Sequence, residues 1–313
     1  GIPEPVMSAL KDGALWWDQA FNAIGYKNAF QVKVLPQDAD PMDVRYNVIQ
    51  WVHRATRGWS YGSSVIDPRS GEIIKGHVTL GSLRVKQDYL IALGLTSPFS
   101  GDGIASDVAG GHNPPDDQVD TSKQIEMALA RIRQLSAHEV GHTLGISHNF
   151  AASEYGRESV RDYPHPLVSV KEGKISLDNA YDVGMGAWDK YVVAYGYQEY
   201  HDAITEQQAL KDLVVDARAK GFKYQSDPDA RQSNAANAQG HLWDNGADPV
   251  SELTRISDVR KVAMANFGLK TIKTGATLSS LEEIFAPIYL LHRYQLDAVA
   301  KLIGGVNYEY ESK

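Results

Sequence analysis

Three histidines at fixed spacing, His138, His142 and His148, constrain this chain more than any other feature. The first two are four residues apart, so on an α-helix they lie one turn apart on the same face and can reach a single ion. Gly145 precedes the third histidine, and a glycine with positive φ can end the helix and turn the chain back. We therefore expect all three histidines to bind one metal ion.

Glu139 follows the first histidine and lies about 100° further round the helix. It is too far round to share the ligand face, but it can reach a water held by the metal. Three neutral imidazoles leave one position of tetrahedral Zn²⁺ open for that water, whose pKa the metal lowers to ~7. A structural zinc would need a fourth protein ligand, and the chain has no cysteine. The pattern therefore predicts a catalytic Zn²⁺ with Glu139 as general base. The competing interpretation is a helix with surface histidines.

The charge and hydropathy of the chain limit the classes of molecule that it can bind. The chain of 313 residues has a formal net charge of -8 and no long basic run, which argues against nucleic acid as a partner. No stretch approaches the ~18 consecutive apolar residues of a membrane-spanning helix. We expect a peptide or protein substrate, and the sequence does not indicate an oligomeric state. The chain begins at Gly1, which suggests a piece of a longer protein.

Apolar periodicity predicts an α+β fold with a twisted mixed sheet and the active-site helix in the N-terminal part and a mainly helical C-terminal part. We place the boundary between two subdomains, 1–146 and 147–313, and expect the metal-binding cleft between them. In the first, we expect helices at 5–24 and at 125–145, the latter preceded by a capping box from Thr121 to Gln124, strands at 30–35, 46–52 and 72–83, and a long loop at 97–120. In the second, helical patterns cover 192–219, 250–267 and 278–302, and 221–246 resembles a polar loop.

The segment from His138 to His148 matches the HExxHxxGxxH signature and so resembles the metzincin clan of zinc peptidases. Other segments resemble large bacterial secreted zinc metalloproteases with uncharacterised domains: 16–17, 67–72, 149–153 and 292–295. The resemblance implies a zinc-dependent endopeptidase, with the three histidines as ligands and Glu139 as base. It also implies a secreted or periplasmic location.

Metzincins carry a methionine in a turn beneath the zinc, in some members as Ser-x-Met-x-Tyr. The nearest match runs from Ser159 to Tyr163, with Arg161 in the methionine position; Met185 is a possible substitute. By resemblance, Tyr163 contacts the zinc or the reaction intermediate. An arginine beside a dication is repelled unless its side chain points elsewhere or pairs with a carboxylate such as Asp162.

The segment 76–81 resembles the edge strand on which metzincins bind extended substrate, and we expect the first strand of that fold to lie upstream of this chain. Three alternatives stay open: a catalytically impaired zinc-binding module that binds peptides or glycans, a zinc amidase with a non-peptide substrate, and a site with Glu154 or Glu158 as third ligand. The isolated histidines are interpreted as structural or surface residues: His53, His77, His112 and His165.

Overall fold

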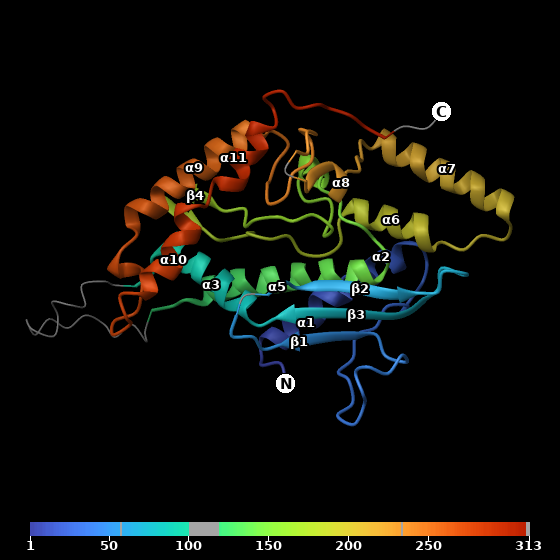
Figure 1. The fold of residues 1–313 in the computed structure, drawn as a ribbon, viewed down its shortest axis with the longest axis horizontal. Helices are drawn as coiled ribbons and strands as arrows, with labels where there is room; N and C mark the ends of the chain where they lie inside the picture. Colours follow the sequence, from blue (N-terminus) through green and yellow to red (C-terminus); the bar gives the residue numbers. More distant parts are fainter. Residues whose placement is uncertain (57, 100–118, 233, 311–313) are drawn as a thin grey trace, which may run out of the picture.

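The computed structural model describes residues 1–56, 58–99, 119–232 and 234–310. These residues form the mixed α+β fold that the sequence predicts, with the strands of the main sheet before residue 82 and mostly helices after residue 186 (Figure 1). The subdomain boundary at residue 146 stays a prediction. Most of the predicted loop at 97–120, with His112, lies outside the described residues.

The main sheet has the strand order β1-β3-β2, formed by β1 (Val48–Val52), β2 (Tyr61–Ile66) and β3 (Ile73–Gly81). β1 runs parallel to β3, with Val48 opposite His77, and β2 runs antiparallel to it. The predicted edge strand at 76–81 is therefore wrong, because it belongs to the central β3. A turn between Asp67 and Glu72, closed by a backbone hydrogen bond of 2.9 Å, folds β2 back along β3, so that β2 is one of the two edge strands of the sheet.

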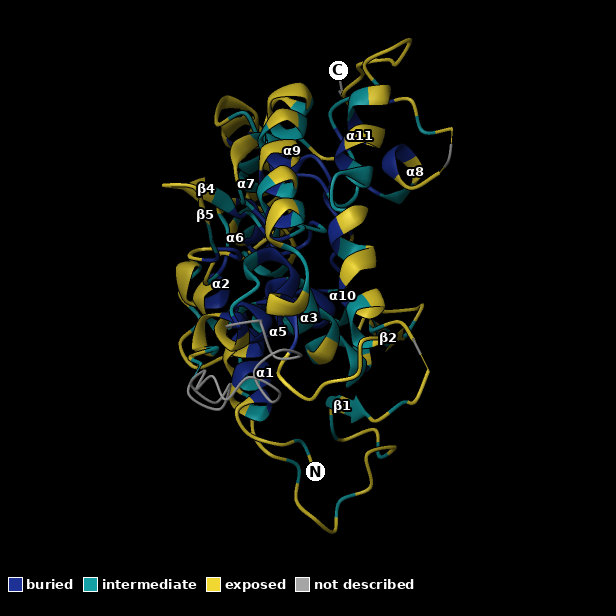
Figure 2. Ribbon diagram, turned by 90° about the vertical axis from the view of Figure 1, so that its left-hand side faces the viewer, coloured by how far each residue is buried: buried dark blue, intermediate teal, exposed yellow. Residues whose placement is uncertain are grey.

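Helix α5 (Ser122–Thr143) runs alongside the sheet (Figure 1) and packs against β2, β3 and helix α1 (Val6–Leu15), and its surroundings are the buried centre of Figure 2. The two helices touch through their backbones, since a Cβ on Gly13 would lie 2.0 Å from the carbonyl oxygen of Arg133. The indole of Trp17, the first residue of α2 (Trp17–Ala23), donates to the carbonyl oxygen of Ala137 at 2.8 Å. This packing holds the C-terminal half of α5 from the side away from the sheet.

The C-terminal part is helical, as predicted, although two of the predicted helices are broken. The pattern at 192–219 corresponds to α6 (Ala187–Tyr197) and α7 (Ala203–Ala219). The others correspond to α9 (Pro249–Asn266), α10 (Ser280–Tyr289) and α11 (Arg293–Ala300). Shorter elements lie between these: η2 (Ala152–Tyr155), β4 (Ser169–Lys171), β5 (Lys174–Ser176), α8 (Asp227–Ala230) and η3 (Leu269–Thr271). No helix in the described part of the chain is long and apolar enough to span a bilayer.

Three local predictions differ from the structure. Residues 30–35 form no strand, because they pair with no neighbouring strand among the described residues. Phe30 stacks on Phe21, with ring centroids 6.2 Å apart, so the alternation of apolar and polar residues in this segment reflects packing against the core. The predicted capping box does not form, because Thr121 makes no side-chain cap and Asp120 instead accepts from the backbone N–H of Ser122 at 2.9 Å. Helix α3 (Leu83–Thr96) has a weak apolar stripe and was not predicted.

Candidate metal centre

His138 and His142 lie in the last turns of α5, and the chain reverses directly after the helix ends. Gly145 has φ of +79°, a conformation that side chains with a Cβ rarely adopt. The N–H of Ile146 then bonds back to the carbonyl oxygen of Gly141 at 3.0 Å. This turn brings His148 to the two helical histidines, as the spacing predicts.

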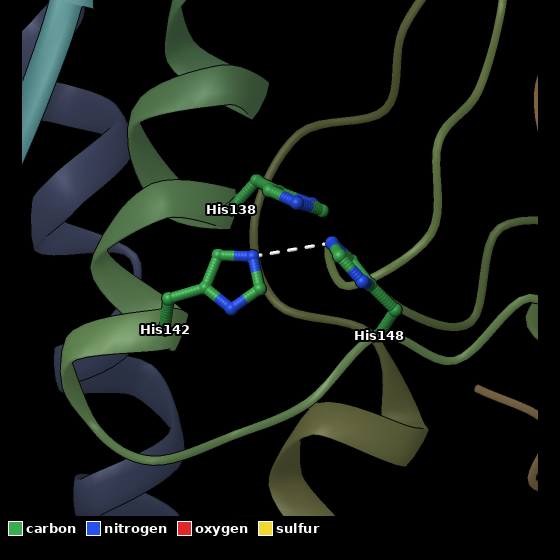
Figure 3. A group of neighbouring side chains, drawn as sticks. All are labelled: His138, His142 and His148. Carbon is green, nitrogen blue, oxygen red and sulfur yellow. Dashed lines mark hydrogen bonds between the residues drawn. The ribbon is translucent and has the colours of Figure 1, made fainter. Parts of the chain in front are cut away.

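The three imidazoles meet in one place (Figure 3), with a ring nitrogen of each residue within 4.8 Å of the other two. The Nε2 atoms of His142 and His148 are 3.1 Å apart. The Nε2 of His138 is buried and has no hydrogen-bond partner among the residues that the structure describes. A buried ring nitrogen without a partner, facing two further imidazoles, fits a metal ion as the missing partner. This is the one such cluster of three or more metal-binding side chains among the described residues.

Two of the histidines each donate a hydrogen bond from Nδ1–H to an oxygen atom. The Nδ1 of His138 donates to the carbonyl oxygen of Val160 at 2.8 Å, and the Nδ1 of His148 donates to Oδ2 of Asp227 at 2.6 Å. This pairing leaves the Nε2 lone pairs free, which is the usual arrangement of metal-binding imidazoles. Burial lowers the pKa of all three rings, to about 3 for His142, and Arg161 lowers them further. The rings are therefore neutral, the form that binds metals.

Glu139 is buried next to this cluster, with 5 % of its surface exposed. Burial raises the pKa of its carboxyl to about 7, although Arg161, Arg131 and the N–H of Gly62 oppose the rise. Gly62 belongs to β2, and a Cβ there would lie 2.0 Å from the carbonyl oxygen of Glu139. The edge strand β2 therefore passes in backbone contact with the helix at the cluster.

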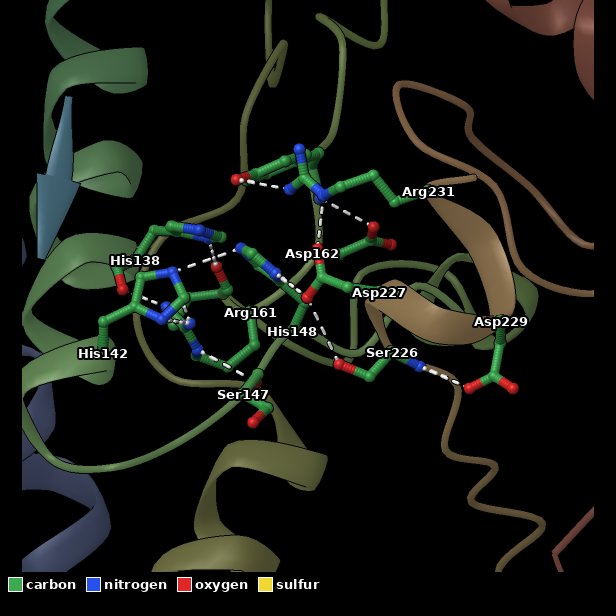
Figure 4. Close-up of polar contacts among 12 residues, drawn as sticks. His138, His142, Ser147, His148, Arg161, Asp162, Ser226, Asp227, Asp229 and Arg231 are labelled. Atoms are coloured by element: carbon green, nitrogen blue, oxygen red, sulfur yellow. Dashed lines mark hydrogen bonds and ion pairs between the residues drawn. The ribbon is translucent and has the colours of Figure 1, made fainter. Parts of the chain in front are cut away.

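Arg161 is fully buried and lies against the histidines rather than away from them (Figure 4). Its guanidinium donates to the carbonyl oxygens of His138 and Ser147 and lies 2.7 Å from Nδ1 and 2.9 Å from Nε2 of His142. Neither expected arrangement occurs, since the contacts of this guanidinium are with His138, His142 and Ser147 and not with Asp162. Desolvation lowers the pKa of Arg161 to about 10. Met185 belongs to the main apolar core, and it is Arg161 that lies against the histidines.

Tyr163 lies beside two of the three imidazoles, with its ring centroid 4.9 Å from that of His138 and 4.7 Å from that of His148. Its other side stacks on Trp243, at 4.9 Å between centroids. Its hydroxyl accepts a hydrogen bond from Arg231 at 3.2 Å. Burial raises the pKa of Tyr163, so the hydroxyl is protonated at neutral pH.

Asp227, Arg231 and Trp243 were missed, because all three lie in the segment predicted as a polar loop. One local signal was present: Ser226 and Asp229 form a capping box that starts the short helix α8 at Asp227. Neither proposed glutamate joins the cluster, because Glu154 pairs with Lys223 at 2.9 Å and Glu158 accepts from the N–H of Ala187 at 3.2 Å.

A family model described as Met-zincin matches residues 120–313, the greater part of the chain. The matched segment contains α5, the three histidines, Arg161, Tyr163 and α8. No curated protein and no solved structure matches the chain. The family match and the converging imidazoles agree on a metal site of the metallopeptidase type. The chain belongs to the Met-zincin family.

Proposed function

We propose that this protein is a zinc-dependent endopeptidase. The observation that carries the proposal is the cluster of three neutral imidazoles, with His138, His142 and His148 as the ligands, beside a buried glutamate. Three nitrogen ligands suit tetrahedral Zn²⁺ with one open position. When bound, Zn²⁺ polarises a substrate carbonyl and lowers the pKa of water to ~7.

The remaining roles belong to side chains of the chain itself. Glu139 takes the proton of the attacking water and returns it to the leaving amine. Tyr163 donates its hydroxyl proton in a hydrogen bond to the oxyanion that develops on the scissile carbonyl. Its place beside His138 and His148 supports this role.

The edge strand β2 supports a peptide as substrate, because an extended peptide can add to an exposed sheet edge through main-chain hydrogen bonds. Gly62 contacts the backbone of Glu139, so that edge passes close to the three histidines. A groove of about 810 Å³ lies between the β2–β3 hairpin and α6. It reaches the residue before His148, and its lining includes Ile66, Ile73, Ser147, Trp188, Tyr191 and Tyr195. Bulky apolar side chains of a substrate fit such a lining.

The test uses protein freed of metal and reconstituted with one equivalent of Zn²⁺, incubated with an unbiased peptide mixture. We expect chelator-sensitive cleavage at internal peptide bonds and one zinc per chain by mass spectrometry. Glu139→Gln should keep the zinc and lose most of the turnover. Glu126→Gln, an exposed carboxyl on the same helix that pairs with Arg133, is the matched control and should leave both unchanged. Full turnover in Glu139→Gln would exclude Glu139 as the base.

The second candidate is a catalytically impaired zinc-binding module, which the buried cation of Arg161 favours because it disturbs His142, one of the three proposed ligands. It predicts bound zinc with no cleavage of any peptide. Parallel assays with non-peptide amides separate this module from a zinc amidase, which would hydrolyse those amides and not peptides.

A further inference from the structure

The short helix α8 contacts two different parts of the metal centre. Asp227 begins the helix and Arg231 lies directly after it, one turn further on. The Asp227 carboxylate accepts from Nδ1 of His148 through Oδ2 at 2.6 Å and from Nε of Arg231 through Oδ1. Figure 4 shows His148 on one side of this carboxylate and Arg231 on the other. The two residues are therefore one ion-paired unit at the rim of the cluster.

Arg231 extends this unit to the tyrosine. Its Nη2 donates to the Tyr163 hydroxyl at 3.2 Å, and its guanidinium carbon lies 5.4 Å from the centre of the Tyr163 ring. The hydroxyl oxygen therefore accepts from a cation, and its own proton must be donated to another acceptor. The Tyr163 ring packs between Trp243 and the histidines, so the hydroxyl has little freedom to leave this position.

We propose that Asp227 and Arg231 are paired positioning residues, in which Asp227 orients His148 toward the metal and Arg231 orients the Tyr163 hydroxyl toward the reacting carbonyl. The proposal rests on the proposed function for the role of Arg231, whereas the role of Asp227 holds for any reaction at this metal. A cation that donates to the tyrosine oxygen also makes that hydroxyl a stronger donor to an oxyanion.

The geometry also excludes a simpler interpretation of the pair as an isolated surface ion pair. The side chain of His148 is 8 % exposed, while those of Asp227 and Arg231 are 38 % and 47 % exposed. The pair thus lies at the boundary between the buried ligands and solvent. Asp216 on α7 and Lys220, which follows that helix, form an ion pair with the same spacing of four residues. It provides matched controls for both substitutions.

The first measurement is the zinc affinity, by competition with a chelating dye, which does not depend on any activity. Asp227→Asn should weaken binding by about 10- to 100-fold, as loss of such outer partners does elsewhere. Arg231→Met should change the affinity by less than about threefold, and so should Asp216→Asn and Lys220→Met. Unchanged zinc affinity in folded Asp227→Asn protein would overturn the role of Asp227, whether or not the protein is a peptidase.

The second measurement is a double-mutant cycle between Arg231 and Tyr163 on a cleaved peptide, with kcat and KM determined separately. Arg231→Met should lower kcat by about 10-fold or more with little change in KM, because the oriented hydroxyl acts in the transition state. In a Tyr163→Phe background the same change should have almost no further effect. Arg231→Lys should restore part of kcat. Equal losses in both backgrounds would show that Arg231 acts without Tyr163 and would overturn this half of the proposal.

Discussion

Replacing Arg161 by methionine should strengthen zinc binding. In the structure the guanidinium lies 2.7 Å from Nδ1 and 2.9 Å from Nε2 of His142. A neutral imidazole carries only one N–H. If the Nε2 lone pair binds a metal, Nδ1 carries the proton and cannot accept from Arg161. The contact therefore competes with metal binding, and Arg161 must move or lose it when the metal enters.

The size of the effect follows from charge and distance. A metal about 2.1 Å from Nε2 lies within about 5 Å of the nearest guanidinium nitrogen, given the 2.9 Å contact. Repulsion between a dication and a cation at about 5 Å is roughly 2 kcal/mol in water and roughly 7 kcal/mol at an effective dielectric constant of about 20. The negative charges of Asp189 and Glu139 offset part of it. Even the lower value corresponds to more than tenfold in affinity.

The assay compares zinc affinities of the parent protein with Arg161→Met, Arg161→Lys and Arg133→Met. The lysine keeps the charge and should bind zinc about as weakly as the parent. Arg133 is a half-buried arginine of α5, the helix that carries His142, and it pairs with Glu126 at 2.6 Å, so its removal controls for net charge. An unchanged or weaker affinity in folded Arg161→Met would refute the reasoning, since it would mean that the arginine supports the site.

Two further changes test the site. In metal-free protein, the raised pKa of Glu139 favours folding when the carboxyl is protonated, and this advantage is lost as pH rises from 4.5 through about 7. Glu139→Gln should therefore gain stability relative to the parent over that range, by up to about 3 kcal/mol, measured by denaturant unfolding; a pH-independent difference would contradict the shift. Gly62→Ala should destabilise the protein and its zinc site, since the added Cβ meets the Glu139 carbonyl oxygen at 2.0 Å. Gly81→Ala in the same sheet meets nothing within 4 Å and is the control for thermal unfolding.

Local spacing rules predicted how the histidines from His138 to His148 come together, because each rule concerns residues that are close in the sequence. Helical periodicity aligns His138 with His142, and Gly145 with φ of +79° returns the chain. The α+β fold class followed from the same kind of periodicity. The edge strand was misplaced because the apolar side chains of β2, Tyr61, Val65 and Ile66, do not alternate with polar ones, and only the pairing with β3 reveals β2 as a strand.

The outer part of the site could not be predicted, because it depends on contacts between residues far apart in the sequence. Asp227 reaches His148 across 79 positions, and Arg231 reaches Tyr163 across 68. A polar segment of this composition predicts a loop, and nothing local indicates which carboxylate will face an imidazole. The same holds for Arg161. The sequence shows an arginine where methionine is expected, but it does not show that the side chain points toward His142.

The partners of the three imidazoles differ in a way that bears on how well this site holds a metal. His138 and His148 each donate to an oxygen, the carbonyl of Val160 and the carboxylate of Asp227, which makes them better ligands. His142 instead faces a donor, the guanidinium of Arg161. With methionine there, His142 would lose this donor and the cation that lies against its ring. We therefore propose that His138 and His148 are already oriented to bind a metal, and that Arg161 weakens the binding of that metal by His142.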